Sequence, residues 1–132
     1  MLWSKSLETG IPKIDEQHKE LFRQADVLVD QSKADRVEST LNFLKDYVAK
    51  HFSDEEAFHR SSNYPKADAH KKLHIEFTGG LKKKVEEFQK STNKSSIILT
   101  INSMVINWLK EHIMRHDKEF ATYYIQKQPP RP

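Results

Sequence analysis

The chain has 132 residues, of which 36% are hydrophobic and 31% are charged, and this composition suits one globular domain. It contains no cysteine, which excludes disulfide scaffolds, thiolate catalysis and cysteine-based metal sites. No stretch is apolar and long enough for a signal peptide or a membrane span. We therefore expect a single domain over residues 1–132 that is soluble and cytoplasmic and does not bind membranes.

The net charge of +3 does not by itself indicate a nucleic-acid partner. Basic residues alternate with acidic ones, as in the run from Lys82 to Glu87 (KKKVEE). Such mixed charge is typical of a solvated helix face, so we expect no binding of nucleic acid. The unusual feature of the composition is the presence of seven histidines in so short a chain.

Apolar residues recur at the three- and four-residue spacing of amphipathic helices, and glycine occurs only three times. In chain order, the pattern predicts an N-terminal arm over about 1–13, helices over about 15–33, 36–61, 65–90 and 95–125, and a frayed tail over 128–132. Pro65 suits the first position of the third helix. Because the connections are short, consecutive helices should be antiparallel neighbours. The prediction is an all-α, up-down-up-down four-helix bundle, with Trp3 of the arm laid on it.

Two adjacent glycines interrupt the pattern of the third helix. Gly79 and Gly80 should each cost about 1 kcal/mol relative to alanine at a helix interior. They indicate either a kink or a close contact with a neighbouring helix, and the residues alone leave both open.

Polar side chains fill the gaps in the apolar seams of the predicted helices. Continuing each seam at helical spacing places six of them in the core, where a buried imidazole or carboxylate without a partner costs several kcal/mol. These residues are His18, His51, Glu55, His70, His74 and His112.

The same six residues lie at one level of the predicted bundle. In antiparallel helices, residues equally far from their connection lie side by side. His18 and His51 are equally far from the first connection, and His74 and His112 are equally far from the third. The residues that face each other across the second connection obey the same rule. Since an error of two residues shifts a level by only about 3 Å, the six side chains should share one layer.

This layer calls for metal ions. Protonated histidines would repel one another, so neutral imidazoles around a cation are expected, and imidazole with carboxylate suits iron, manganese or zinc. Six donors exceed what one tetrahedral ion uses, which favours two ions and a second carboxylate beside Glu55. In the fourth helix, helical spacing from His112 favours His116, whereas charge balance favours Asp117. Spacing and charge leave both open, with Asp117 preferred.

Four stretches together resemble the hemerythrin family, specifically its single-domain bacterial type. They are Gly10 to His18 (GIPKIDEQH), His51 to Glu56 (HFSDEE), His70 to His74 (HKKLH) and Trp108 to Asp117 (WLKEHIMRHD). The likeness extends from about Trp3 to Tyr124. In the family pattern an aspartate follows the last histidine five residues later. The resemblance therefore implies that Asp117 is the ligand and that His116 is not.

The resemblance implies a non-haem di-iron centre bridged by two carboxylates and an oxo or hydroxo group. One iron would be held by His70, His74 and His112, the other by His18 and His51, with Glu55 and Asp117 as the bridges. The two-histidine iron would keep an open position for dioxygen. The residues that resemble the family's oxygen pocket are Leu21, Phe52, Trp108, Leu109 and Ile113.

The expected function is reversible binding of dioxygen, for storage, delivery or sensing, by a protein that is not an enzyme. The chain is expected to be a monomer or a weak homo-oligomer. The alternative is a di-iron enzyme that reduces peroxide or dioxygen or handles nitric oxide. Against it, no acid or base other than the ligands is expected in the pocket. A weaker interpretation is a store for iron or zinc.

One further histidine, His59, lies off the predicted seam. We expect it on the surface or just behind the ligands. Glu56 and His59 form one Glu-x-x-His motif, but a ferritin-like di-iron enzyme needs that motif on two helices, and the second copy is missing.

Overall fold

The computed structural model describes residues 3–30 and 35–127. Their elements are η1 (Lys5–Leu7), α1 (Pro12–Val29), α2 (Val37–Ser61), α3 (Ala67–Lys90), α4 (Lys94–His112), a π-helical turn η3 (Ile113–Asp117) and α5 (Lys118–Lys127). The predicted frayed tail over 128–132 and the predicted end of the first helix at residue 33 lie outside the described residues.

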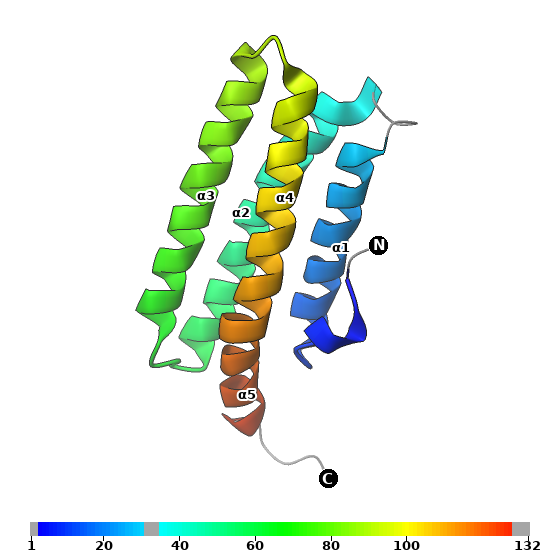
Figure 1. The fold of residues 1–132 in the computed structure, drawn as a ribbon. Coiled ribbons are helices and arrows are strands. Elements are labelled where there is room, and N and C mark those ends of the chain that lie inside the picture. The colour runs from blue at the N-terminus through cyan, green and yellow to red at the C-terminus, as the bar shows by residue number, and fades with distance from the viewer. Residues whose placement is uncertain (1–2, 31–34, 128–132) are drawn as a thin grey trace.

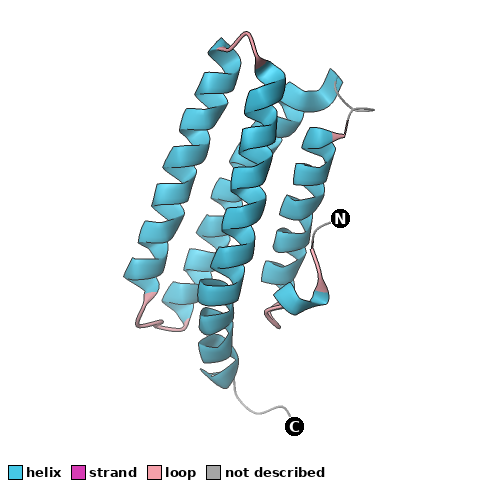
Figure 2. Ribbon diagram, viewed as in Figure 1, coloured by secondary structure: helices cyan, strands magenta, loops and turns pink. Residues whose placement is uncertain are grey.

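The helices form an antiparallel four-helix bundle (Figure 1). The segments α4, η3 and α5 follow one another without a break and make up the fourth rod. Each rod contacts two neighbours, since α1 meets α2 and α4, and α3 meets the same two helices from the other side. Within the described residues the chain is helix and connecting loop, with no strand (Figure 2). The predicted all-α bundle is therefore confirmed.

The N-terminal arm is attached to the bundle at two places. Trp3 is half-buried against the apolar core, and the Lys19 ammonium lies 4.8 Å from the centre of its ring. The carboxylate of Asp15, in the first turn of α1, accepts hydrogen bonds from the Thr9 and Gly10 amides. Gly10 has φ of 94°, a conformation that favours glycine. These contacts fix the direction in which the arm enters α1.

Two helix starts differ from the predicted ones. Helix α1 begins at Pro12, three residues before the predicted start near 15, because proline fits the first helical position. Helix α3 begins at Ala67, so the expectation that Pro65 opens it is wrong. Asn63 adopts φ of 55°, and the Tyr64 amide donates to the His59 carbonyl at 3.0 Å. This left-handed helix ending turns the chain before Pro65, which then lies in the connecting turn.

The glycine pair does not bring two helices together. Helix α3 continues through Gly79 and Gly80, and a Cβ atom added at either position would meet nothing within 4 Å. Close contact with a neighbouring helix, one of the two expectations from the sequence, is therefore wrong.

The core consists of two apolar clusters with buried polar residues between them. Along α1, Ile14 belongs to the smaller cluster and Leu21 to the larger one, and His18 lies between them. Along the fourth rod, Asp117 separates Ile113 from Phe120 in the same way. This arrangement places one polar layer across the whole bundle. No helix among the described residues is both long and apolar enough to cross a membrane.

Candidate metal centre

The polar layer contains two groups of donor atoms, and within each group the atoms lie no more than 4.8 Å apart. Every member is buried. The first group consists of His70, His74, His112, Glu55 and Asp117, and the second of His18, His51, Glu55 and Asp117. Glu55 and Asp117 are the two residues common to both groups.

The donor atoms of the first group lie at about hydrogen-bonding distance from one another. The Nε2 atoms of His70 and His112 lie 2.8 Å apart, and those of His74 and His112 lie 3.2 Å apart. Oε1 of Glu55 lies 3.0 Å from His70 Nε2. The same nitrogens and oxygens therefore face a common centre from three helices.

The carboxylate of Asp117 connects the two groups. Its Oδ1 lies 3.0 Å from Nε2 of both His70 and His112, while its Oδ2 lies 3.1 Å from Nε2 of His18. The rings of His18 and His51 are 4.7 Å apart on that second side. One oxygen of Asp117 thus faces two histidines of the first group, and the other faces His18 of the second.

Among the described residues, several of these atoms make no hydrogen bond, although some of them lie close to an oppositely polarised atom of the layer. Within the described part of the chain, no hydrogen bond reaches either carboxylate oxygen of Glu55, either ring nitrogen of His18, or Oδ1 of Asp117. Buried polar atoms without a partner are costly, and buried carboxylates more so. Cations at the two centres would pair with all of them. Imidazole and carboxylate are donors that iron accepts, so the residues fit a di-iron site.

A π-helical turn brings Asp117, rather than His116, into the layer. In a regular α-helix, residues five apart point about 140° away from each other, which is why spacing alone favoured His116. Here the Lys118 amide donates to the Ile113 carbonyl five residues back. The wider turn rotates Asp117 onto the face of His112, and such turns occur often at functional sites. His116 is left half-buried outside both groups.

Two residues behind the donors orient them. Nδ1 of His51 donates to Oε1 of Gln17 at 2.7 Å, and Nδ1 of His74 donates to Oε2 of Glu56 at 2.9 Å. Each bond leaves the Nε2 lone pair of that histidine facing the centre. Sequence reasoning missed both partners. Their positions next to His18 and Glu55 were the only available signal.

His59 is buried, which rules out the surface and agrees with the other expectation, a place just behind the ligands. The residue is 1% exposed and follows Glu55 by one helical turn on α2. Its ring lies 4.5 Å from that of His70 and 4.3 Å from that of Phe120. Neither ring nitrogen has a hydrogen-bond partner among the described residues. The spacing of four from Glu55 could have indicated its burial.

Electrostatics in the metal-free protein follow from burial and from the close carboxylates. Burial and the adjacent His18 lower the pKa of His51 to about 3. Burial also disfavours protonation of His70, but contacts with Asp117 and Glu55 outweigh it and raise the pKa to about 9. Burial opposes ionisation of Asp117 as well, yet His112 and the other histidines lower its pKa. At neutral pH a proton on His70 therefore partly neutralises the carboxylates, and a bound cation would displace it.

An apolar wall lies on one side of the layer. The Phe52 ring stacks on His74 with centroids 3.9 Å apart, and the half-buried Trp108 stacks on His112 at 4.2 Å. The remaining residues predicted for the oxygen pocket, Leu21, Leu109 and Ile113, are fully buried in the same apolar cluster as Phe52.

Comparison with known proteins agrees with this geometry. The sequence pattern of the family described as the hemerythrin HHE cation binding domain matches residues 9–124. The chain belongs to the hemerythrin family. The match includes every donor of the two groups and the helices that carry them.

Individual hemerythrin relatives match most of the chain. A bacteriohemerythrin of Clostridium acetobutylicum is 33% identical over 90% of this chain and 97% of its own length. A hemerythrin of Sipunculus nudus is 29% identical over 90% of this chain and 89% of its own. A myohemerythrin of Theromyzon tessulatum is 36% identical over 61% of this chain and 64% of its own.

Membership of the hemerythrin family supports oxygen binding at a di-iron site, and proteins of this family are mainly oxygen-binding proteins. The cluster of buried histidines and carboxylates suits such a site.

Proposed function

We propose that this chain binds dioxygen reversibly at a centre of two iron ions, for oxygen storage, delivery or sensing. One observation carries the proposal: the two buried donor groups share Glu55 and Asp117 but contain different numbers of histidines. His70, His74 and His112 would hold one iron, and His18 and His51 the other. The second iron then has one protein donor fewer and keeps a position for a ligand.

The shared carboxylates would bridge the two ions together with an oxo or hydroxo group. The two oxygens of Asp117 face opposite groups, as a bridge requires. When bound, the iron pair supplies the electrons that make dioxygen binding possible. The protein's own part is to hold neutral imidazoles and two carboxylates in a fixed arrangement, for which Gln17 and Glu56 orient His51 and His74.

The residues around the open position favour a neutral gas. Leu21, Phe52, Leu109 and Ile113 are buried, and with Trp108 they offer no ionisable group to a ligand. A dry apolar wall excludes water and anions because both lose hydration there. Among the described residues, the additional buried imidazole, His59, lies toward Tyr64 and Phe120, which belong to the other apolar cluster. The wall thus lacks a proton donor for reductive chemistry.

The test is to load the protein with ferrous iron without oxygen, count iron per chain, and record visible spectra before and after exposure to air. We expect two irons per chain, a colourless reduced form, and colour in air that disappears when oxygen is removed. One iron per chain would overturn the di-iron assignment. Colour that forms and then decays irreversibly while added peroxide is consumed would replace the carrier by the enzyme alternative.

A further inference from the structure

One glycine of the pair in α3, Gly79, borders a pocket that reaches the metal layer from outside. This pocket of about 400 Å³ lies between α2 and α3. It is lined from α2 by Ala49, Phe52 and Glu56, and from α3 by His74, Ile75 and Gly79. Two of these residues, Phe52 and Glu56, contact His74 directly.

Phe52 separates this pocket from the interior. Its side chain is 4% exposed, lines the pocket, and stacks on His74. On its inner side the ring lies 5.7 Å from that of His51 and 5.6 Å from that of Trp108. One aromatic ring therefore lies between the solvent-facing pocket and the donors of the two-histidine group. Rotation of this one side chain would open the pocket toward His51.

The chemistry of the pocket suits a small neutral molecule. Ile75 at its edge is 60% exposed, and Ala49 and Phe52 add apolar surface, while Ser53 and Thr78 contribute uncharged hydroxyl groups. Glu56 is the only acidic side chain among the described residues that line it, and its negative charge disfavours anions. A gas that enters loses little hydration, whereas a hydrated anion would lose much more.

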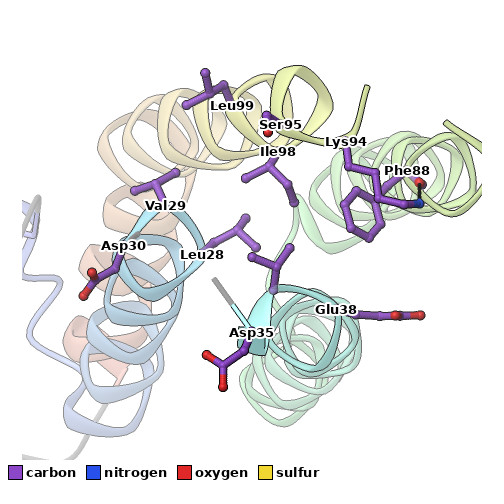
Figure 3. Close-up of a pocket in the computed structure, with 11 residues that line it drawn as sticks. Leu28, Val29, Asp30, Asp35, Glu38, Phe88, Lys94, Ser95, Ile98 and Leu99 are labelled. Carbon is purple, nitrogen blue, oxygen red and sulfur yellow. Dashed lines mark hydrogen bonds between the residues drawn. The ribbon is translucent and has the colours of Figure 1, made fainter. Parts of the chain in front are cut away.

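A larger pocket elsewhere does not lead to the layer. It has a volume of about 510 Å³ and is lined by Leu28, Phe88 and Ile98 among others. In Figure 3 the side chains of Leu28 and Ile98 point toward its middle. None of the described residues that line it is a metal donor. The lining of the pocket beside Gly79, by contrast, includes a donor, His74.

We propose that the pocket beside Gly79 is the entry route for dioxygen, with Phe52 as the movable wall; this inference rests on the proposed function. The role of Gly79 follows. A Cβ there would meet nothing within 4 Å, so close packing does not explain the glycine. Absence of a side chain keeps the pocket open at its edge, at a cost of about 1 kcal/mol in helix propensity. Nothing in the structure explains Gly80.

The adjacent glycines provide a matched pair of variants. Gly79→Leu inserts a side chain at the pocket. Gly80→Leu inserts the same side chain one residue later, at a position where a Cβ is equally unhindered but which does not line the pocket. Both changes alter helix propensity equally. In the iron-loaded protein, Gly79→Leu should slow oxygen association and dissociation by the same several-fold factor and leave the equilibrium constant unchanged. A change of route does not alter the bound state. Gly80→Leu should leave both rates as in the wild type.

A second measurement does not depend on iron. Dissolved oxygen is paramagnetic and broadens nearby proton resonances, so NMR of the metal-free chain under oxygen pressure reports access to the Phe52 ring. We expect weaker broadening of its ring protons in Gly79→Leu than in Gly80→Leu or the wild type. Equal broadening and equal oxygen rates in all three proteins would overturn the route. So would equal slowing in both variants. If the loaded wild type binds no oxygen, the proposed function fails, and the broadening alone decides the route.

Discussion

The two sides of the metal layer are built from similar donors but differ in their surroundings. On the three-histidine side, His74 donates to the carboxylate of Glu56, and the buried ring of His59 lies against His70. On the two-histidine side, His51 donates to the neutral amide of Gln17. A carboxylate partner makes a histidine a more basic ligand than an amide partner does.

The difference indicates that the two sides of the metal layer have different roles. The three-histidine side has more protein donors and a charged partner, which suits firm retention of a metal ion. The other side has fewer donors, which suits exchange of a neutral ligand. Changes that affect one side and spare the other test this comparison.

The largest effect is expected at the residue that joins the two sides. Asp117→Ala removes both oxygens that face the donor groups, so the variant should retain fewer than two irons per chain. His116→Ala is the control, because His116 is adjacent in sequence but outside both groups. Metal analysis after desalting measures the ratio, and circular dichroism verifies the fold. If Asp117→Ala kept two irons while His116→Ala lost them, the assignment of the bridge would be wrong.

The partners of the ligands come next. Glu56→Ala should weaken iron binding by about 10- to 100-fold, as is typical when the partner of a metal-bound histidine is lost. Gln17→Ala, the corresponding change on the other side, removes a neutral acceptor and should cost less. Competition with a coloured chelator gives both affinities. Equal losses would mean that the charge on Glu56 makes no difference between the sides.

The apolar wall can be opened without touching a donor. Leu109→Ala should speed irreversible oxidation of the bound iron pair by on the order of tenfold, because a cavity beside the proposed open position would admit water; tenfold corresponds to about 1.4 kcal/mol in the barrier. Leu41→Ala removes an equally buried leucine at the other end of the core and serves as the control for lost stability. The decay of the oxygenated spectrum in air measures the rate. Equal decay rates in the two variants would contradict the position of the wall.

His59 provides the smallest and most specific test. Burial lowers its pKa to about 4, so between pH 6.5 and 4 the unfolded chain binds a proton that the folded chain does not. This histidine therefore makes the metal-free protein less stable as the pH falls, by on the order of 2 kcal/mol between pH 7 and 5. His59→Met removes that dependence and two unpaired nitrogens, which should stabilise the protein by about 1 kcal/mol at pH 7.

Urea unfolding of the metal-free wild type and the His59→Met variant at pH 7 and pH 5 measures both effects. A variant that is as acid-sensitive as the wild type would show that His59 is not the group responsible. Retention of two irons by the variant would show in addition that His59 lies behind the donors rather than among them.

The sequence by itself determined the bundle and the layer. Helical periodicity identifies which side chains face the core, and the distance of each residue from its connection sets its level. These two rules suffice to bring residues as far apart as His18 and His112 together. They depend only on the regular rise of an α-helix, so small errors at the helix ends do not disturb them. The change in the start of α3 from Pro65 to Ala67 left the layer intact.

Only the tertiary structure decided the features that depend on rotation and side-chain reach. The π-helical turn before Lys118 changes the periodicity locally, and no residue pattern predicted it. The burial of His59, the hydrogen bonds from Gln17 and Glu56, and the position of Phe52 between pocket and donors depend on how neighbouring helices are rotated. Periodicity identifies the face of a helix to within about one residue. Contacts at 3 Å are set by packing between helices, which one-dimensional spacing does not contain.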